Sequence, residues 1–189
     1  MQDLKNFSRT DTTQDWAPAD LHAGLDSTLN IVINEIKYKA DIVKEYGDLP
    51  EVECLSSQLN QVFMNLLVNA AQAINKARGR IVIRTGVEGH LAWVEVADDG
   101  AGMTAEVKAR VFDPFFTTKP VGKGTGLGLS LSYGIVQRHG GRIDLASEVG
   151  KGTTFRIWLP IRHAVAGTSA AADAARPREG ELLMSAVGD

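Results

Sequence analysis

The chain has 189 residues, of which 44% are hydrophobic and 23% are charged, and its formal net charge is −3. This length allows one domain with a sizeable core, and the weak negative charge excludes the broad basic field of a nucleic-acid-binding or membrane-surface protein. A single cysteine excludes an intrachain disulfide, and the lack of a run of about 18 apolar residues argues against a membrane span. We therefore expect a cytoplasmic domain without nucleic-acid or membrane contact. The full-length protein could still be anchored in a membrane.

The first half of the chain predicts two helices and a strand. Residues 1–20 are polar and contain Pro18, which indicates a linker or the frayed end of a helix. Apolar residues from Leu21 to Ile36 have helical spacing, and residues 42–46 suggest a short strand. Residues 56–77 form the clearest helix, with one continuous apolar face, and Arg78-Gly79 is typical of a helix C-terminus.

A first hairpin and a long loop come next. Residues 81–85 and 91–96 predict two strands, with the turn between them at residues 86–89. Residues 98–126 are rich in turn-forming residues and too long for a simple connection, which is typical of a functional loop.

The second half predicts a helix and a second hairpin. The helix covers residues 127–139, and the hairpin strands cover residues 142–147 and 153–159. Residues 164–189 lack sustained apolar periodicity, and we expect that tail to be disordered. This order of elements predicts an α+β two-layer sandwich, with helices packed on one face of a mixed sheet.

Two asparagines are the first candidates for chemistry. Asn65 and Asn69 are four residues apart, so they lie on one side of the helix. Asparagine is unfavourable inside a helix and costly to bury without partners. They are either surface or capping residues, or both amides face a ligand or a hydrated metal. A neutral carbonyl oxygen suits Mg²⁺, which takes few protein ligands and keeps several waters.

An acidic glycine motif follows the first hairpin, Asp98-Asp99-Gly100-Ala101-Gly102-Met103. Its glycines superficially fit a dinucleotide-binding fingerprint, but two carboxylates would repel a pyrophosphate and the chain lacks repeated βαβ units. A carboxylate here can accept a hydrogen bond from an exocyclic amine such as adenine N6, and the glycines let a flat ring approach the backbone. A simple acidic turn is the alternative.

A second glycine motif, Gly122 to Ser130, leads into the helix that begins near Leu127. Glycines at a helix N-terminus expose N–H groups, and the helix dipole favours anions there, so the motif is a candidate phosphate cradle. It is not a Walker A loop. A flexible linker is the alternative, but it explains poorly the leucines that follow at once. An aromatic segment upstream, residues 112–119, suggests a lid that packs over a ligand.

Together these segments resemble the histidine-kinase branch of the gyrase, Hsp90, histidine kinase and MutL ATPase superfamily, which has the Bergerat fold. Residues 65–70 look like the N box, residues 98–102 like the first glycine box, and residues 112–116 like the F box. Residues 124–129 look like the second glycine box, and residues 150–155 are similar to the closing Gly-x-Gly-Thr hairpin. All five occur in the family order, which makes a chance match very improbable.

The resemblance implies a nucleotide site for ATP and Mg²⁺. Asn69 would coordinate the metal, with Asn65 supporting the metal or the phosphates, and Asp98 would bind adenine N6 with Gly102 beside the ring. Residues 103–123 would form the ATP lid. The remaining implied nucleotide-binding residues are Gly100, Lys119, Lys123, Gly124, Thr125, Gly126, Leu127, Gly128 and Thr153.

One position separates the branches of the superfamily. Gyrase-type and Hsp90-type members place a water-activating glutamate four residues before the metal-binding asparagine. Here that position is Asn65, whose amide cannot act as a base. We therefore expect the domain to hold ATP without rapid hydrolysis and to deliver phosphate to a histidine.

The phosphoacceptor histidine implied by the resemblance is missing. It should lie on a dimerising helical hairpin and be followed by Glu or Asp, and none of the four histidines has that context. Residues 1–20 resemble the end of that hairpin and a linker, residues 21–163 would be the catalytic domain, and we expect the chain to be a fragment. The implied partners are its own phosphoacceptor domain and a response regulator. The alternative function is a nucleotide-binding module, either a degenerate sensor or a partner-switching domain like anti-sigma serine kinases.

Overall fold

The computed structural model describes residues 15–122 and 124–163, so the expectations for residues 1–14, Lys123 and the tail 164–189 lie outside the described part. The helices are α2 (Leu21–Ile36), α3 (Ser56–Ala73), α4 (Ala105–Arg110) and α5 (Gly128–Arg138). The strands are β1 (Ala17–Ala19), β2 (Ala40–Tyr46), β3 (Val52–Cys54), β4 (Gly79–Glu88), β5 (Leu91–Asp98), β6 (Arg142–Glu148) and β7 (Gly152–Pro160).

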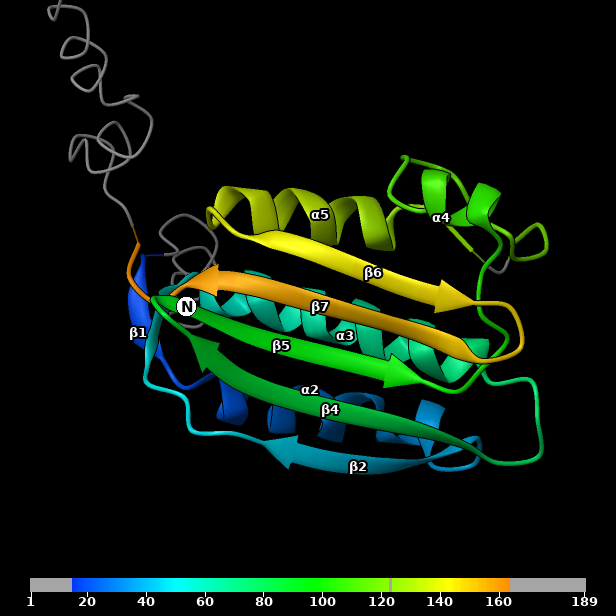
Figure 1. Ribbon diagram of the computed structural model, residues 1–189, viewed down its shortest axis with the longest axis horizontal. Coiled ribbons are helices and arrows are strands. Elements are labelled where there is room, and N and C mark those ends of the chain that lie inside the picture. The colour runs from blue at the N-terminus through cyan, green and yellow to red at the C-terminus, as the bar shows by residue number, and fades with distance from the viewer. Residues whose placement is uncertain (1–14, 123, 164–189) are drawn as a thin grey trace, which may run out of the picture.

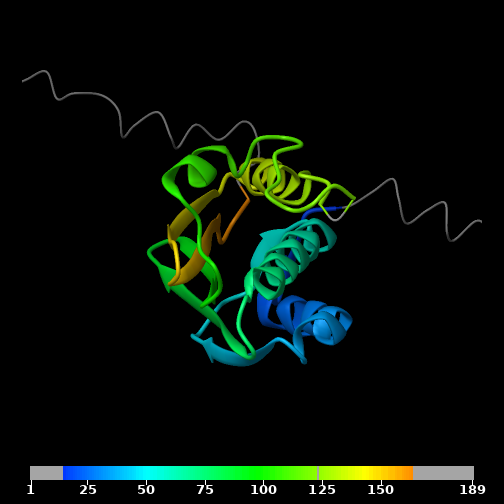
Figure 2. The same cartoon turned by 90° about the vertical axis from the view of Figure 1, so that its right-hand side faces the viewer.

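The predicted two-layer architecture is confirmed. Five strands form one sheet in the order β2-β4-β5-β7-β6, in which β2 runs parallel to β4 and the other pairs are antiparallel. Helices α2, α3 and α5 cover one face of this sheet (Figure 1), and Figure 2 shows them nearly end-on beside it. The remaining pair, β1 and β3, forms a separate antiparallel sheet.

The core lies between the sheet and the three helices because each element buries one face. Along β4, Ile81 and Ile83 are fully buried, and the helices contribute the fully buried side chains of Leu25, Phe63 and Leu67. The period of two in the strand and of three to four in the helices brings these side chains into one layer.

Several boundaries differ from the predictions. Helix α3 ends at Ala73 rather than near residue 77, because Ile74 has extended backbone (φ −67°, ψ 117°) and the Ala73 carbonyl accepts a hydrogen bond from Ala101 N–H (2.9 Å). Gly79 does not terminate the helix but begins β4. Strand β4 continues to Glu88, through most of the predicted turn at residues 86–89. The structure also adds β1 within the predicted linker, pairs it with β3, and places α4 within the predicted loop.

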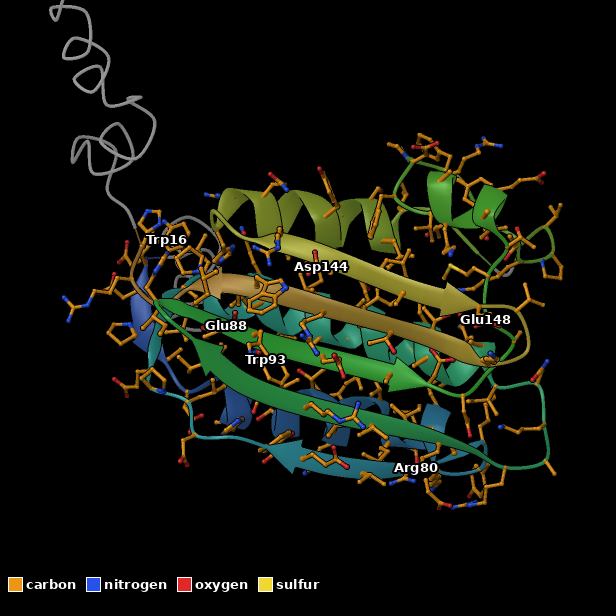
Figure 3. All side chains as sticks on the ribbon, viewed as in Figure 1. Trp16, Arg80, Glu88, Trp93, Asp144 and Glu148 are labelled. Carbon is orange, nitrogen blue, oxygen red and sulfur yellow. The ribbon has the colours of Figure 1, made fainter. Side chains whose placement is uncertain are left out.

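On the other face of the sheet, the described residues place no helix, and charged and aromatic side chains of the strands themselves lie there. Figure 3 shows Arg80, Glu88, Trp93 and Asp144 projecting from this face. Near its centre, Glu95 is only 5% exposed although it is charged, because two arginines on neighbouring strands bind its carboxylate. Register pairs these three residues directly across β4, β5 and β7: Arg84, Glu95 and Arg156.

An aromatic junction closes the domain at the end of the sheet near β1. The Trp16 ring stacks on His163 (centroids 3.4 Å apart, planes 8° apart) and packs against His139 (4.7 Å). His139, at the C-terminal end of α5, is buried; its Nε2 accepts from Leu55 N–H (3.1 Å) and its Nδ1 donates to the Ile135 carbonyl (2.8 Å). These contacts require a neutral ring, and desolvation lowers the pKa of His139.

Candidate functional site

A cleft of about 860 Å³ lies at the other end of the sheet, between α3 and the segment that links β5 to α5. One wall of the cleft comes from α3 and the end of β5. The other wall comes from residues 101–119, the start of α5 and β7. Its size is that of a site for a drug-sized or nucleotide-sized ligand.

The α3 wall presents both predicted asparagines. The Nδ2 of Asn65 donates to the Gly128 carbonyl (3.0 Å) and to the Ser132 hydroxyl (3.1 Å), so this side chain connects α3 to α5. The Oδ1 of Asn69 accepts from Lys119 Nζ (3.3 Å), which crosses from the opposite wall. Burial lowers the pKa of Lys119, because removal from water disfavours its charged form.

Asp98 lies at the last position of β5 and lines the cleft. Burial raises the pKa of Asp98 to about 6, and the nearby charge of Asp99 adds to this effect, while backbone hydrogen bonds from Gly100 and Thr153 oppose it. The Gly100 N–H donates to Asp98 Oδ1 at 2.9 Å. The carboxyl group is therefore held in place and only partly hydrated, as a group that recognises a polar ligand atom should be.

Two glycines in this motif are required by close backbone contacts. A Cβ at Gly100 would lie 2.3 Å from the Ala73 carbonyl oxygen, and a Cβ at Gly102 would lie 2.0 Å from the Glu148 carbonyl oxygen. Gly102 also has φ +72°, a conformation that favours glycine. The motif thus packs α3, β5 and the β6–β7 turn together at the edge of the cleft.

The start of α5 is suited to an anion. No side chain caps this helix at Leu127, so its first-turn N–H groups lack that partner. Gly126 (φ +68°) and Phe115 (φ +65°) both have left-handed backbone, and Phe115 N–H donates to the Gly126 carbonyl (2.9 Å). With Gly124 and Gly128 in the cleft wall, this helix N-terminus is a candidate phosphate site.

The aromatic residues of the predicted lid divide into three roles. Phe112 packs on Tyr133 (5.4 Å between centroids) and edge-on to Phe155 (6.2 Å), which anchors the segment to the core. Phe116 lines the cleft, with Arg110 over its ring (4.6 Å). Phe115 is 75% exposed and points away from the core.

Most of the predicted site residues lie together in this cleft. Two predicted residues do not line the cleft: Gly100, whose N–H donates to Asp98 Oδ1, and Leu127, which is 41% exposed. Lys123 is outside the described residues. The residues that line the cleft are Asn65, Asn69, Asp98, Gly102, Lys119, Gly124, Thr125, Gly126, Gly128 and Thr153. Sequence reasoning missed Ser132, whose partner Asn65 is 67 positions away, and α4, which is too short to show a periodic pattern.

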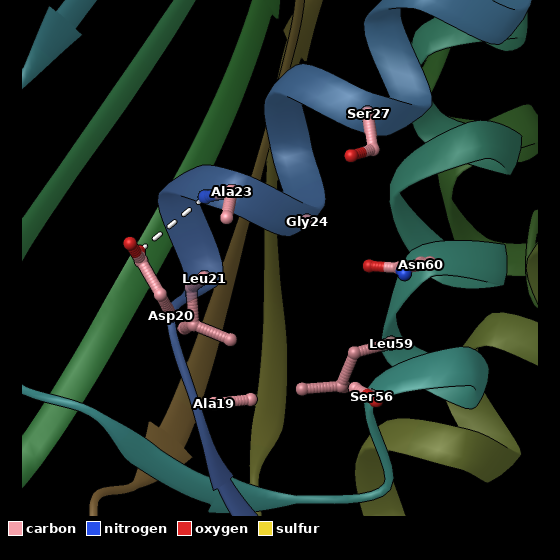
Figure 4. Close-up of a pocket in the computed structure, with 9 residues that line it drawn as sticks. All are labelled: Ala19, Asp20, Leu21, Ala23, Gly24, Ser27, Ser56, Leu59 and Asn60. Atoms are coloured by element: carbon pink, nitrogen blue, oxygen red, sulfur yellow. Dashed lines mark hydrogen bonds between the residues drawn. The ribbon is translucent and has the colours of Figure 1, made fainter.

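A second, smaller hollow of about 220 Å³ lies between the first turns of α2 and α3 (Figure 4). Small side chains such as Ala23, Gly24 and Ser27 leave this space. Its acidic residue, Asp20, already caps α2 by accepting from His22 and Ala23 N–H groups. We assign it no ligand.

Comparison with known proteins identifies the family. Residues 54–163 match the family described as histidine kinase-, DNA gyrase B-, and HSP90-like ATPase. The chain belongs to this family. It is 38% identical over 164 residues to the signal transduction histidine-protein kinase AtoS of Escherichia coli (strain K12), which covers 85% of this chain and 26% of AtoS. It is 46% identical over 128 residues to the sensor kinase CckA of Brucella abortus (strain 2308), which covers 60% of this chain and 13% of CckA.

Solved structures of this ATPase family agree with the fold. The catalytic domain of histidine kinase ThkA superposes with a TM-score of 0.70 at 28% identity, covering 78% of this chain and 97% of that domain. Full-length ShkA, solved in complex with AMPPNP, gives a TM-score of 0.70 at 25% identity over 83% of this chain and 33% of ShkA. The chain therefore contains the ATP-binding catalytic domain of sensor histidine kinases and spans about a quarter or less of AtoS and CckA.

Two absences hold for residues 15–122 and 124–163. No helix there is long and apolar enough to cross a membrane. No group of three or more His, Cys, Asp or Glu side chains there could hold a metal ion.

Proposed function

We propose that this domain transfers the γ-phosphate of ATP to a histidine on the phosphoacceptor hairpin of a sensor kinase, which then supplies a response regulator. A histidine nitrogen forms the bond to the γ-phosphorus as the bond to the β–γ bridging oxygen breaks, and ADP leaves. Protein groups contribute positioning and charge stabilisation to such a step rather than covalent chemistry. The observation that carries the proposal is that the Asn65 amide is hydrogen-bonded to α5, in a cleft whose wall includes the uncapped N-terminus of that helix.

The residues of the cleft fit this ligand. Asp98 offers a carboxylate at one end for the adenine amine, and Gly124, Gly126 and Gly128 offer a cradle for phosphates at the other. Lys119 lies on the phosphate side, where its ammonium group is partly desolvated and would interact strongly with an anion.

The residues also fit Mg²⁺. Asn69 Oδ1 already accepts a hydrogen bond from a cationic group, Lys119 Nζ, so the position suits positive charge. One amide oxygen together with phosphates and waters is the coordination that Mg²⁺ takes readily. When bound, the ion would neutralise charge on the β- and γ-phosphates. Asn69 would hold it, and Lys119 would move from Asn69 towards the phosphates.

The lack of a carboxylate at Asn65 favours a histidine acceptor over water. An amide has no pKa in the physiological range and cannot take a proton from water. Both hydrogen bonds from its Nδ2 also fix it against α5. A neutral histidine nitrogen can attack without first losing a proton to a base, so ATP held here would react with that nucleophile in preference to water.

Transfer to a separately produced phosphoacceptor hairpin tests this function. We expect acid-labile, base-stable label on the hairpin when the chain and γ-labelled ATP are present, and none on a hairpin whose phosphoacceptor histidine is alanine. Acid-stable label on a serine would instead support the partner-switching class. Label on the chain alone, or steady ATP turnover of about 1 per second, would contradict the proposal.

A further inference from the structure

Ser132 lies in α5, one turn after its start at Gly128, where α5 contacts α3. Its side chain is completely buried, with 0% exposure. Its hydroxyl donates to the Gly128 carbonyl (2.8 Å) and lies 3.1 Å from the Asn65 Nδ2, which donates to it. Asn65 Nδ2 also donates to the same carbonyl (3.0 Å), so three hydrogen bonds form a closed triangle.

This triangle decides which way the Asn65 amide faces. A backbone carbonyl can only accept, so the atom of Asn65 beside the Gly128 oxygen must be its NH₂ group. The Ser132 hydroxyl donates its one proton to that carbonyl and accepts from the same NH₂ group of Asn65. The NH₂ group is thereby held on the α5 side, and the group that Asn65 offers to the cleft is its carbonyl oxygen, Oδ1.

We propose that Ser132 is a positioning residue that presents the oxygen of Asn65, and not its NH₂, to the metal side of bound nucleotide. An oxygen at this place can accept from a metal-bound water or contact the cation, but it repels phosphate oxygens. Asn65 would therefore interact with the metal ion or its waters, and Ser132 would hold the Asn65 amide in the orientation that allows this. This role rests on the proposed use of Mg-ATP.

The same contacts make Ser132 more than a packing residue. Without its hydroxyl, the NH₂ group of Asn65 loses one of its two buried acceptors, so the orientation with NH₂ towards α5 becomes less favoured relative to the rotated one. Rotation would place N–H donors beside the phosphates and move the oxygen away from the metal. The expected effect is a loss of the contribution of Mg²⁺ to nucleotide binding, with little change in binding of metal-free ATP.

Ser132→Ala in the whole 189-residue chain tests this role. We expect its affinity for ATP with Mg²⁺ to fall about fivefold, while its affinity for ATP in EDTA changes less than twofold. Thr28→Val is the matched control, because the buried Thr28 hydroxyl also donates to the carbonyl four residues earlier (Gly24, 2.7 Å), on a helix that does not line the cleft. Ser132→Thr keeps the hydroxyl and should recover the Mg²⁺ effect if its methyl group fits.

A double-mutant cycle with Asn65→Ala separates positioning from general stability. In the Asn65→Ala background, Ser132→Ala should leave the Mg²⁺ effect unchanged, because there is no amide to position. Equal loss of affinity with Mg²⁺ and with EDTA would show that Ser132 only supports the fold. The same conclusion would follow if Ser132→Ala weakened Mg-ATP binding as much in the Asn65→Ala background as in the wild type.

The amide orientation can be read without nucleotide. In the wild type, the side-chain NH₂ group of Asn65 should exchange its protons slowly with solvent, and Ser132→Ala should make this exchange faster in NMR spectra. Unchanged exchange would overturn the positioning role even if ATP binds normally. Failure of the wild type to bind ATP would instead refute the proposed function, and this role with it, while the NMR result would still report the orientation.

Discussion

Asp98 should make adenine binding depend on pH, because its pKa of about 6 lies in an accessible range. Only the ionised carboxylate is a pure acceptor for the adenine amine, and binding should therefore favour ionised Asp98. With a pKa of about 6, nearly all molecules are ionised at pH 8 and about one in eleven at pH 5. If the ionised form alone binds well, affinity should fall about tenfold between pH 8 and pH 5.

The assay is calorimetry of Mg-ATP binding at several pH values, on the wild type and on Asp98→Asn. The phosphates of ATP titrate in the same range, but they do so equally for both proteins, so the ratio of the two Kd values isolates Asp98. At pH 8, Asp98→Asn should weaken ATP by about 1–3 kcal/mol, the cost of mispairing a buried hydrogen-bonding group. The ratio should then shrink towards pH 5.

Inosine triphosphate provides the control ligand because it lacks the N6 amine. Its binding should respond little to Asp98→Asn, and the Kd ratio for the two proteins should stay flat with pH. A constant ATP ratio between pH 5 and pH 8, or equal ATP affinity of the two proteins at pH 8, would refute the assignment of Asp98 to the adenine amine.

Three further predictions concern the lid, the aromatic junction and the open sheet face. Trypsin should cut within residues 103–122 more slowly when Mg-ATP is present, since this segment lines the cleft; identical digestion with and without nucleotide would argue against a lid. The free energy of unfolding should fall as pH drops below about 6.5, because the unfolded chain takes up a proton that His139, with its lowered pKa, resists. Urea titrations should show a flatter pH dependence for His139→Gln than for the wild type, and no flattening for His90→Gln at an exposed turn. Glu95→Ala should destabilise the fold by about 1–3 kcal/mol, since it leaves two half-exposed arginines without their shared carboxylate, whereas exposed Glu88→Ala should change the melting temperature little.

Local patterns predicted the main layers of this fold because each long element buries one face, and the apolar residues of that face form a recognisable pattern in the sequence. Residues 21–36 have helical periodicity and residues 81–85 are rich in β-branched side chains, and both became the expected elements. Strands β1 and β3 have three residues each and exist only because they pair with each other across the chain. Such short strands carry no periodic signal of their own.

The end of α3 shows where tertiary contacts override a local pattern. Ile74 and Ala77 continue the apolar spacing, and the sequence alone extends the helix through them. In the structure, the Ala73 carbonyl is taken by Ala101 N–H, and Gly100 packs so closely that no further turn can form. The first glycine motif thus limits the helix that carries the asparagines.

The candidate site was predictable in its parts but not in its connections. The glycines, Asp98 and both asparagines have residue types that point to a nucleotide and a metal. The hydrogen bonds that orient Asn65 link it to Gly128 and Ser132, which are 63 and 67 positions later in the chain, so these bonds depend on how α3 and α5 pack. Ser132 has an ordinary helical context in the sequence, and only the folded arrangement shows what it binds.

The stacking of Trp16 on His163 brings the two ends of the described domain to one point, away from the cleft. Domains whose ends meet can be inserted into a loop of another protein without separating the host strands. They can also be circularly permuted. A chain that joins residue 163 to residue 16 through a few glycines and opens at the exposed Gly89 turn should keep the whole nucleotide cleft intact. As a building block, this domain therefore behaves like a module with a single attachment point.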